Sequence, residues 1–343
     1  MLWLLLPPAL LVLALAALWL IGERGHLMLP STRADLDQQR RGTRSERSGR
    51  RRRGSLLNAL HGYIYGRWCF QYIGFCINTL FPRVTSERFK RWWADHYHGK
   101  VLPTELACAI ITLDHDIKRT DLEQIVPYPT ARDILLKASP TVTLLECPCR
   151  HARESPCQPT DVCMVVGGGD FTLEHHPNRS RRISRDEALA LLQAEHERGH
   201  VHTAYFKDAC DNKFYAICNC CSCCCGGVEA MVTYGVPMVA SSGYVAEVDE
   251  ALCIACGNCE EACPFEAISV NGVSRVNWAK CMGCGVCVGQ CDTEGITLVR
   301  DERKGVPLDV REIGVASDDG DGWRATGRNR TDDHSITNRE LYR

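Results

Sequence analysis

The chain has 343 residues, of which 22 are cysteine, 24% are charged and 45% are hydrophobic, and its formal net charge is −2. This composition excludes a disordered chain and a polytopic membrane protein, and the small net charge excludes a global field that attracts nucleic acid. Cysteine is too sparse for a short secreted disulfide scaffold, so the spacing of the cysteines must decide whether they are bridged, catalytic or metal-binding.

The first 22 residues form an uncharged apolar segment, MLWLLLPPALLVLALAALWLIG. As a helix rising 1.5 Å per residue, it would span about 30 Å, the thickness of a bilayer core. It lacks the basic start and the small-residue cleavage site of a secretory leader. We therefore predict a transmembrane helix over residues 1–22.

Residues 23–55 form a linker that contains the arginine-rich stretch RRGTRSERSGRRRRG. Basic residues favour the cytoplasmic side of a span. The sequence therefore predicts a single-pass membrane protein with its N-terminus outside and its soluble domain in the cytoplasm. Anionic membrane lipid is the expected partner of these arginines, and no nucleic acid is expected.

Residues 56–145 are predicted to form a helical region. The first part, residues 56–82, is rich in aromatic residues at helical spacing, which fits either a helix lying at a membrane interface or an ordinary packed helix. Amphipathic helical patterns follow in ERFKRWWADHYHG, ELACAIITL and TARDILLKA. No nucleotide-binding or nucleophile-elbow motif occurs here. We expect this region to link the anchor to the cysteine-rich region that follows.

Residues 146–243 contain two dense groups of cysteines. The first has four thiols within 17 residues of a proline-rich stretch, which is enough for one metal site. The second has six thiols within eight residues, too many neighbours to face one small ion. A subset of the following residues is expected to bind metal: Cys147, Cys149, Cys157, Cys163, Cys218, Cys220, Cys221, Cys223, Cys224 and Cys225.

Several kinds of site fit these two groups. A further iron–sulfur cluster, a zinc site, a redox-active dithiol and plain packing all stay open, although a reducing cytoplasm disfavours structural disulfides. A helix with a capping box at Ser184 and Glu187, ended by Gly199, separates the groups. Four nearby histidines are interpreted as solvated or hydrogen-bonded residues: His175, His176, His200 and His202. The four cysteines outside any ligand spacing are interpreted as packed thiols: Cys69, Cys76, Cys108 and Cys210.

Residues 244–300 carry a duplicated cysteine motif. The pattern C-x2-C-x2-C-x3-C occurs twice at an offset of 28 residues, and short strand patterns flank each copy, which predicts small antiparallel ribbons. In such a motif, three thiolates from one loop bind one cluster and the fourth ligates the other cluster. The predicted ligands are Cys253, Cys256, Cys259 and Cys291 for cluster 1, and Cys281, Cys284, Cys287 and Cys263 for cluster 2.

This segment resembles a bacterial-type ferredoxin domain with two [4Fe–4S] clusters. The whole chain is similar to uncharacterised membrane-anchored iron–sulfur proteins with such a C-terminal dicluster domain, a resemblance that implies cofactors and no particular substrate. One departure is Asp292, which follows the last cysteine where the family usually has proline. Its charge would disfavour the more negative, reduced state of the cluster that Cys291 ligates, so we expect a shifted potential there.

The sequence as a whole predicts an α+β fold. Its parts are an N-terminal transmembrane helix, a mainly helical middle region with cysteine-rich loops, a ferredoxin-like domain with short antiparallel ribbons, and a polar, disordered tail over residues 301–343. The predicted function is membrane-anchored electron transfer, with a redox protein or a membrane respiratory enzyme as partner. The alternative is an oxidoreductase, in which the upstream cysteines form the active centre and the ferredoxin domain supplies electrons.

Overall fold

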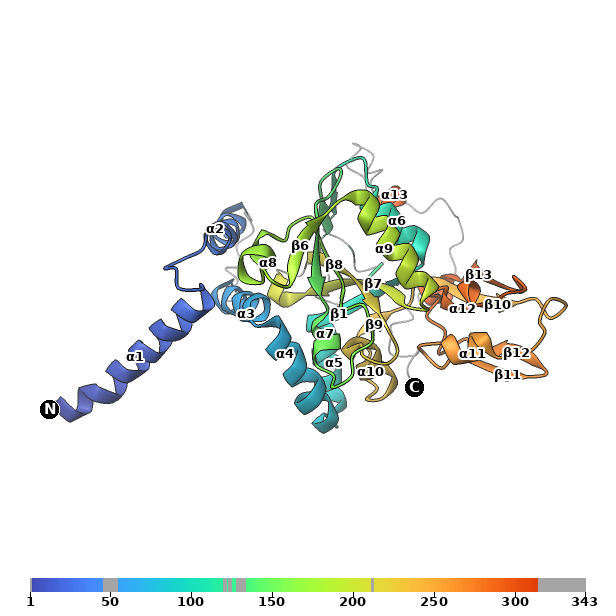
Figure 1. The fold of residues 1–343 in the computed structure, drawn as a ribbon, viewed down its shortest axis with the longest axis horizontal. Coiled ribbons are helices and arrows are strands. Elements are labelled where there is room, and N and C mark those ends of the chain that lie inside the picture. The colour runs from blue at the N-terminus through green and yellow to red at the C-terminus, as the bar shows by residue number, and fades with distance from the viewer. Residues whose placement is uncertain are drawn as a thin grey trace, which may run out of the picture.

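A computed structural model describes residues 2–45, 55–119, 122, 125–127, 134–210 and 213–313. A seven-stranded sheet occupies the middle of the molecule, and α1 projects from one end (Figure 1). Two small two-stranded ribbons lie at the opposite end. The predicted arginine-rich stretch falls largely on residues 46–54, which lie outside the described residues.

The central sheet contradicts the predicted, mainly helical middle region. Neighbouring strands are antiparallel except for the last pair, which is parallel. In sheet order the strands are β6 (Ser180–Ile183), β4 (Val142–Glu146), β5 (Asp161–Val166), β8 (Lys213–Cys220), β7 (Val201–Lys207), β1 (Tyr97–Leu102) and β9 (Val239–Ala240).

The sequence signal for these strands is masked by polar residues that the fold buries. His98 and Lys100 in β1 are each only 1% exposed, and β7 is buried along its whole length. Because both faces are covered, the strands do not show the alternation of polar and apolar residues that marks a half-exposed sheet.

Helices pack around the sheet, lie beside the two ribbons, or, in the case of α1, project from one end of the molecule (Figure 1). In chain order they are α1 (Leu2–Gly22), α2 (Pro30–Ser45), α3 (Ser55–Arg67), α4 (Cys69–Phe75), α5 (Glu87–His96), α6 (Thr104–Ile111), α7 (Pro148–His151), α8 (Asp170–His175), α9 (Arg185–Glu197), α10 (Gly226–Val232), α11 (Asn258–Ala262), α12 (Val286–Gly289) and α13 (Val310–Ile313). A π-helical turn, Cys76–Leu80, continues α4, and short 3₁₀ turns cover Phe81–Arg83, Asp208–Cys210 and Glu302–Lys304.

Three of the predicted helices are confirmed as α5, α6 and α9. Ser184 caps α9 by accepting a hydrogen bond from the backbone N–H of Glu187 at 3.1 Å. The pattern TARDILLKA is different, because Ile134–Leu136 form the strand β3, which pairs with β2 (Ile117–Arg119). The prediction of a helix there was wrong: Ile134 and Leu136 are two residues apart and both are buried, which fits a strand.

In the part of the chain that the structure describes, no helix has both the length and the apolar composition needed to cross a membrane. The predicted transmembrane helix over residues 1–22 and the predicted single-pass location are therefore wrong. The last turn of α1 makes contacts within the protein: the ring of Trp19 stacks on Tyr63 with centroids 5.0 Å apart. Glu23, directly after the helix, is fully buried and accepts a hydrogen bond from Thr32 at 3.0 Å.

The expected ribbons flank the duplicated cysteine motif. β10 (Tyr244–Val248) pairs with β13 (Ile296–Arg300), and β11 (Ile268–Asn271) pairs with β12 (Val273–Val276), both antiparallel. Beyond them, where a disordered tail was expected from residue 301, the chain still forms a 3₁₀ turn and α13, with Leu308 fully buried. The rest of the predicted tail, residues 314–343, lies outside the described residues.

Candidate metal centres

The duplicated motif surrounds two separate cavities, each lined by four cysteines. One cavity is lined by Cys253, Cys256, Cys259 and Cys291, and the other by Cys263, Cys281, Cys284 and Cys287. Each quartet takes three cysteines from one copy of the motif and the fourth from the other copy. The structure thus brings together both predicted quartets, and their ligation of clusters stays a prediction.

Backbone geometry brings the chain close around the second cavity. Gly283 has a φ of 62°, and a Cβ at this position would collide with the backbone oxygen of Tyr244 and the hydroxyl of Ser242. Only glycine combines this left-handed conformation with so close an approach. The Ser242 hydroxyl donates a hydrogen bond to the Gly283 carbonyl at 2.7 Å, which connects this loop to the segment that follows β9.

Several donors point at the cysteine sulfurs. The backbone N–H of Ala267 lies 3.2 Å from Cys263 Sγ, and that of Ala246 lies 3.5 Å from Cys281 Sγ. At the first cavity, Ser274 Oγ lies 3.2 Å from Cys259 Sγ, and the Ser274 N–H donates to Cys253 Sγ at 3.4 Å. Hydrogen bonds from the Ser274 hydroxyl and backbone lower the pKa of the Cys253 thiol. Such donors favour anionic sulfur and tune the potentials of iron–sulfur clusters.

The spacing of these sulfurs suits a cluster better than a single ion. Among the described residues, metal-ligand atoms that all lie within 4.8 Å of one another occur in one group of cysteines, which contains Cys157. No cysteine of the two quartets belongs to that group. In a cube each thiolate binds a different iron, so the four sulfurs stand further apart than around one ion. All 22 cysteines are free thiols, so no disulfide competes for these residues.

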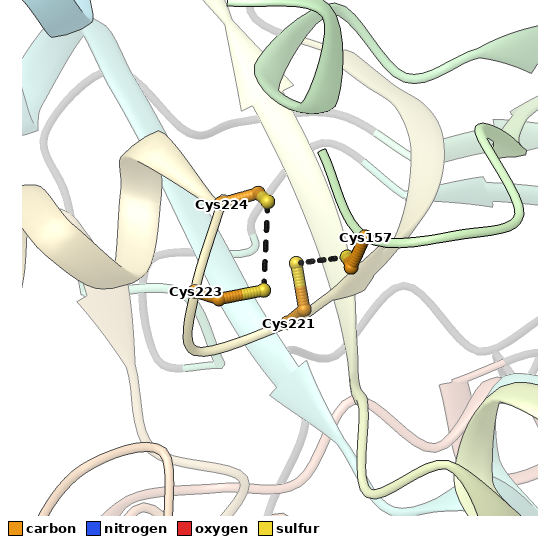
Figure 2. A group of neighbouring side chains, drawn as sticks. All are labelled: Cys157, Cys221, Cys223 and Cys224. Atoms are coloured by element: carbon orange, nitrogen blue, oxygen red, sulfur yellow. Dashed lines mark hydrogen bonds between the residues drawn. The ribbon is translucent and has the colours of Figure 1, made fainter. Parts of the chain in front are cut away.

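The ten upstream cysteines divide into two sets. The four-cysteine set consists of Cys157, Cys221, Cys223 and Cys224, whose sulfurs all lie within 4.8 Å of one another (Figure 2). The six-cysteine set consists of Cys147, Cys149, Cys163, Cys218, Cys220 and Cys225, which all line one large cavity. Each of these two sets therefore contains cysteines from both of the groups that are separate in the sequence.

Thiol contacts connect the six-cysteine set. Hydrogen bonds from Cys149 and Cys163 lower the pKa of the Cys147 thiol, and hydrogen bonds from Cys149 and Cys220 lower that of Cys225. The pKa of Cys149 is raised, because it serves as a donor to both low-pKa sulfurs. A chain of sulfurs thus runs from Cys163 to Cys220 across two strands. Thiolates clustered so closely are ready ligands, since a metal can replace the shared protons.

The cavity beside this set has a volume of about 1020 Å³. Four tyrosines help to line it: Tyr65, Tyr97, Tyr205 and Tyr215. The hydroxyls of Tyr65 and Tyr215 are 2.8 Å apart, and burial raises the pKa of both phenols, which are therefore neutral. Pockets of this size that combine apolar walls with a few polar groups are typical of small-molecule and cofactor sites.

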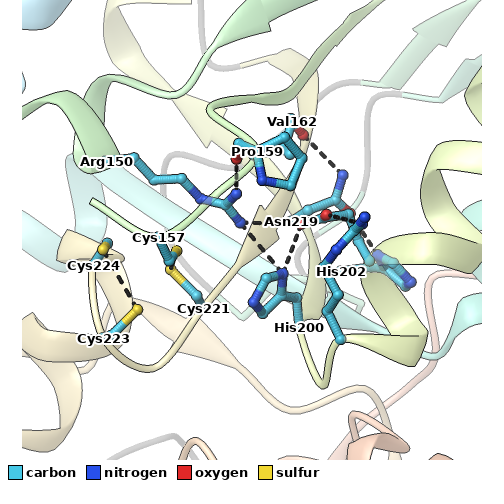
Figure 3. A network of polar contacts seen from close by, with 12 residues as sticks. Arg150, Cys157, Pro159, Val162, His200, His202, Asn219, Cys221, Cys223 and Cys224 are labelled. Carbon is cyan, nitrogen blue, oxygen red and sulfur yellow. Dashed lines mark hydrogen bonds and ion pairs between the residues drawn. The ribbon is translucent and has the colours of Figure 1, made fainter. Parts of the chain in front are cut away.

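A buried ionic network lies beside the four-cysteine set (Figure 3). Arg150 and Glu195 are both fully buried and form an ion pair at 3.0 Å, and His200 Nδ1 lies 2.6 Å from the same carboxylate. The pKa of Arg150 is raised above its ordinary value: burial acts against this, and the charges of Cys221 and Glu195 outweigh it. Neither Arg150 nor Glu195 was given a role from the sequence, and Glu195 lies within α9, the helix that was expected only to separate the two cysteine groups.

The four histidines considered in the sequence analysis have hydrogen-bond or ion-pair partners. His202 Nδ1 lies 2.6 Å from Asn219 Oδ1, and His176 Nε2 lies 2.8 Å from the Gly66 carbonyl oxygen. His175 Nδ1 lies 3.0 Å from the carbonyl oxygen of Phe171. These contacts support the interpretation of the histidines as hydrogen-bonded residues.

Comparison with known proteins identifies part of this arrangement. Residues 246–269 match the family model of the 4Fe-4S binding domain. The chain carries an iron–sulfur domain. The match contains the first copy of the cysteine motif and ends before the second copy begins at Cys281. No curated protein and no solved structure matches the chain.

Proposed function

We propose that this protein is an electron carrier whose ferredoxin domain holds two [4Fe–4S] clusters, one in each four-cysteine cavity. The observation that carries the proposal is the exchange of the fourth cysteine, since Cys291 lines the first cavity and Cys263 the second. This crossing is the ligation pattern of two-cluster ferredoxins. Two clusters held in one small domain pass single electrons.

The exposed edge of cluster 1 is the proposed contact for a redox partner. Cys256 is exposed, and the neighbouring Ile254 is 69% exposed, an unusual position for an isoleucine beside a cofactor. The ferredoxin domain also carries six acidic residues that are all exposed: Glu247, Asp249, Glu250, Glu260, Glu261 and Glu266. A protein with a basic docking face would be steered here, and its rate of electron exchange would fall as salt increases.

Anaerobic purification with iron and sulfide counts tests the proposal. We expect about eight irons and eight sulfides from the ferredoxin domain and two one-electron midpoints in protein-film voltammetry. Cys256→Ser should alter the signal of one cluster, and Cys284→Ser that of the other. A single midpoint in the unmodified chain, or one signal altered by both variants, would contradict the two-cluster proposal.

The large cavity favours a second candidate function, an iron–sulfur reductase. In this reading the six-cysteine set holds a further cluster that faces the cavity and receives electrons from the ferredoxin domain. An iron content above about eight per chain would support this function if the additional iron is lost in Cys220→Ser. Both ferredoxin midpoint potentials should stay unchanged in that variant. Carbon monoxide binds iron with an open coordination position, so a change in the EPR spectrum on its addition would favour catalysis over pure electron transfer.

A further inference from the structure

The four-cysteine set joins two separate loops of the chain. Cys157 lies in the loop between α7 and β5, whereas Cys221, Cys223 and Cys224 follow β8 directly. Figure 2 shows the four side chains pointing toward a common centre from these two loops. Two of the four are buried, and Cys223 is exposed at the edge. Nothing in the electron-transfer role of the ferredoxin domain uses these residues.

The distances between the sulfurs fit a single ion. Cys157 Sγ lies 3.4 Å from Cys221 Sγ, Cys223 Sγ lies 3.4 Å from Cys224 Sγ, and all four sulfurs are within 4.8 Å of one another. Four thiolates bound to zinc at about 2.3 Å in a tetrahedron have sulfurs about 3.8 Å apart. A cube of four irons would need a wider set, because every thiolate would then bind a different iron.

The surroundings suit a site with excess negative charge. A divalent ion with four thiolates carries a net charge of −2, which is costly to bury without a nearby cation. Arg150 lies beside the set with its side chain fully buried (Figure 3). Its Nε atom has no hydrogen-bond partner among the described residues, which leaves one N–H available for a thiolate.

The four-cysteine set is distinct from the cavity site. Of its members only Cys221 lines the large cavity, whereas all six cysteines of the other set do. An ion here would hold the loop that carries Cys157 against the segment that leads into Cys225 and α10. It would therefore fix one wall of the cavity without occupying it.

We propose that Cys157, Cys221, Cys223 and Cys224 bind one zinc ion, which joins the two loops and is separate from every iron–sulfur cluster of the protein. Zinc is favoured over ferrous iron because, in the general order of divalent-metal affinities, a given site binds Zn²⁺ more tightly than Fe²⁺. Four cysteines leave no open position, as in structural zinc sites, so the ion is expected to stabilise the fold and not to react.

Metal analysis of the full chain, purified anaerobically, tests the proposal. We expect about one zinc per chain in addition to the iron, and an X-ray absorption spectrum at the zinc edge with four sulfurs at about 2.3 Å. Cys223→Ser should weaken zinc binding more than about tenfold in competition with a chelator and leave the iron count and both ferredoxin midpoints unchanged. Cys223→His should retain zinc, since three cysteines and one histidine form a common zinc site.

A matched control separates this site from its neighbour. Cys220 lies three residues before Cys223 in the sequence and belongs to the six-cysteine set. The variant Cys220→Ser should therefore leave the zinc content unchanged. Four outcomes would overturn the proposal: no zinc in the unmodified chain, one tetrathiolate iron in place of zinc, zinc retained in Cys223→Ser, or zinc lost equally in Cys220→Ser. Because the ferredoxin midpoints are measured separately, failure here is distinguishable from failure of the electron-transfer proposal.

Discussion

Removing the hydroxyl of Ser274 should lower the midpoint potential of cluster 1 alone. Ser274 is 6% exposed, and its Oγ lies 3.2 Å from Cys259 Sγ and 3.5 Å from Cys253 Sγ. A hydroxyl that donates to a thiolate stabilises the reduced cluster more than the oxidised one, because the reduced cluster is more negative. Ser274→Ala removes this donor and keeps the backbone N–H that bonds Cys253.

The magnitude follows from the strength of one hydrogen bond. A hydrogen bond to a charged group contributes about 1.5–3 kcal/mol, and we take roughly a third of that, about 0.5–1 kcal/mol, as the difference between the two oxidation states. For a one-electron couple a tenfold change in equilibrium constant corresponds to about 59 mV. The midpoint of cluster 1 should therefore fall by about 20–45 mV.

Protein-film voltammetry of the anaerobically purified chain measures this shift. The matched control is Ser269→Ala, since Ser269 lies in the same hairpin with its side chain exposed. The control should leave both midpoints in place, and Ser274→Ala should move one of them. An equal shift of both midpoints, no shift at all, or the same shift in the control would refute the reasoning.

Three further predictions concern buried or charged groups. Arg150→Met removes the fully buried guanidinium that pairs with the buried carboxylate of Glu195 and should destabilise the protein by about 3–5 kcal/mol in guanidinium chloride unfolding. Arg198→Ala, which removes a half-exposed partner of the same carboxylate, should change the stability little. Burial lowers the pKa of His202 to about 4, so between about pH 6.5 and pH 4 the unfolded chain binds a proton that the folded chain does not. The free energy of unfolding should therefore fall by about 3 kcal/mol as the pH falls through this range. The variant His202→Gln should lack this part of the pH dependence. Asp292→Asn removes an exposed charge next to Cys291 and should raise one midpoint by roughly 10–30 mV at low salt and by less at high salt, whereas an unchanged midpoint at low salt would refute the expected influence of this carboxylate.

The parts of the molecule that the sequence predicted well are those with local signals. The first three cysteines of each copy lie within seven residues of one loop, so the sequence alone could name which cysteines line each of the two cavities; their ligation of clusters stays a prediction. The capping box at Ser184 predicted the start of α9 for the same reason, since one side chain and one backbone N–H decide it. Such features depend on neighbours in the chain and not on the rest of the fold.

The central sheet escaped prediction because its strands are defined by distant partners. Lys100 lies inside β1 and Lys207 ends β7, and both are almost fully buried, so their charges suggest a surface where the fold has a core. Lys207 is held by aromatic rings, with its Nζ 4.4 Å from the ring centroid of Tyr97 and 4.8 Å from that of Tyr65. No pattern in the local sequence reveals that these rings, from α3 and β1, surround the ammonium group.

The division of the upstream cysteines follows from that same sheet. Along β8, side chains alternate between faces, so Cys218 and Cys220 point to one side while Asn219 points to the other, where its Oδ1 lies 2.6 Å from His202 Nδ1. The strand ends at Cys220, and the alternation ends with it, so the next thiol, Cys221, is free to turn toward Cys157. A run of neighbouring cysteines that looked like one group therefore divides into two sets, because the end of a strand falls within it. If β8 continued by one residue, the alternation would place Cys221 on the face of Asn219 and away from Cys157. The position of this strand end therefore decides which thiols come together in the four-cysteine set.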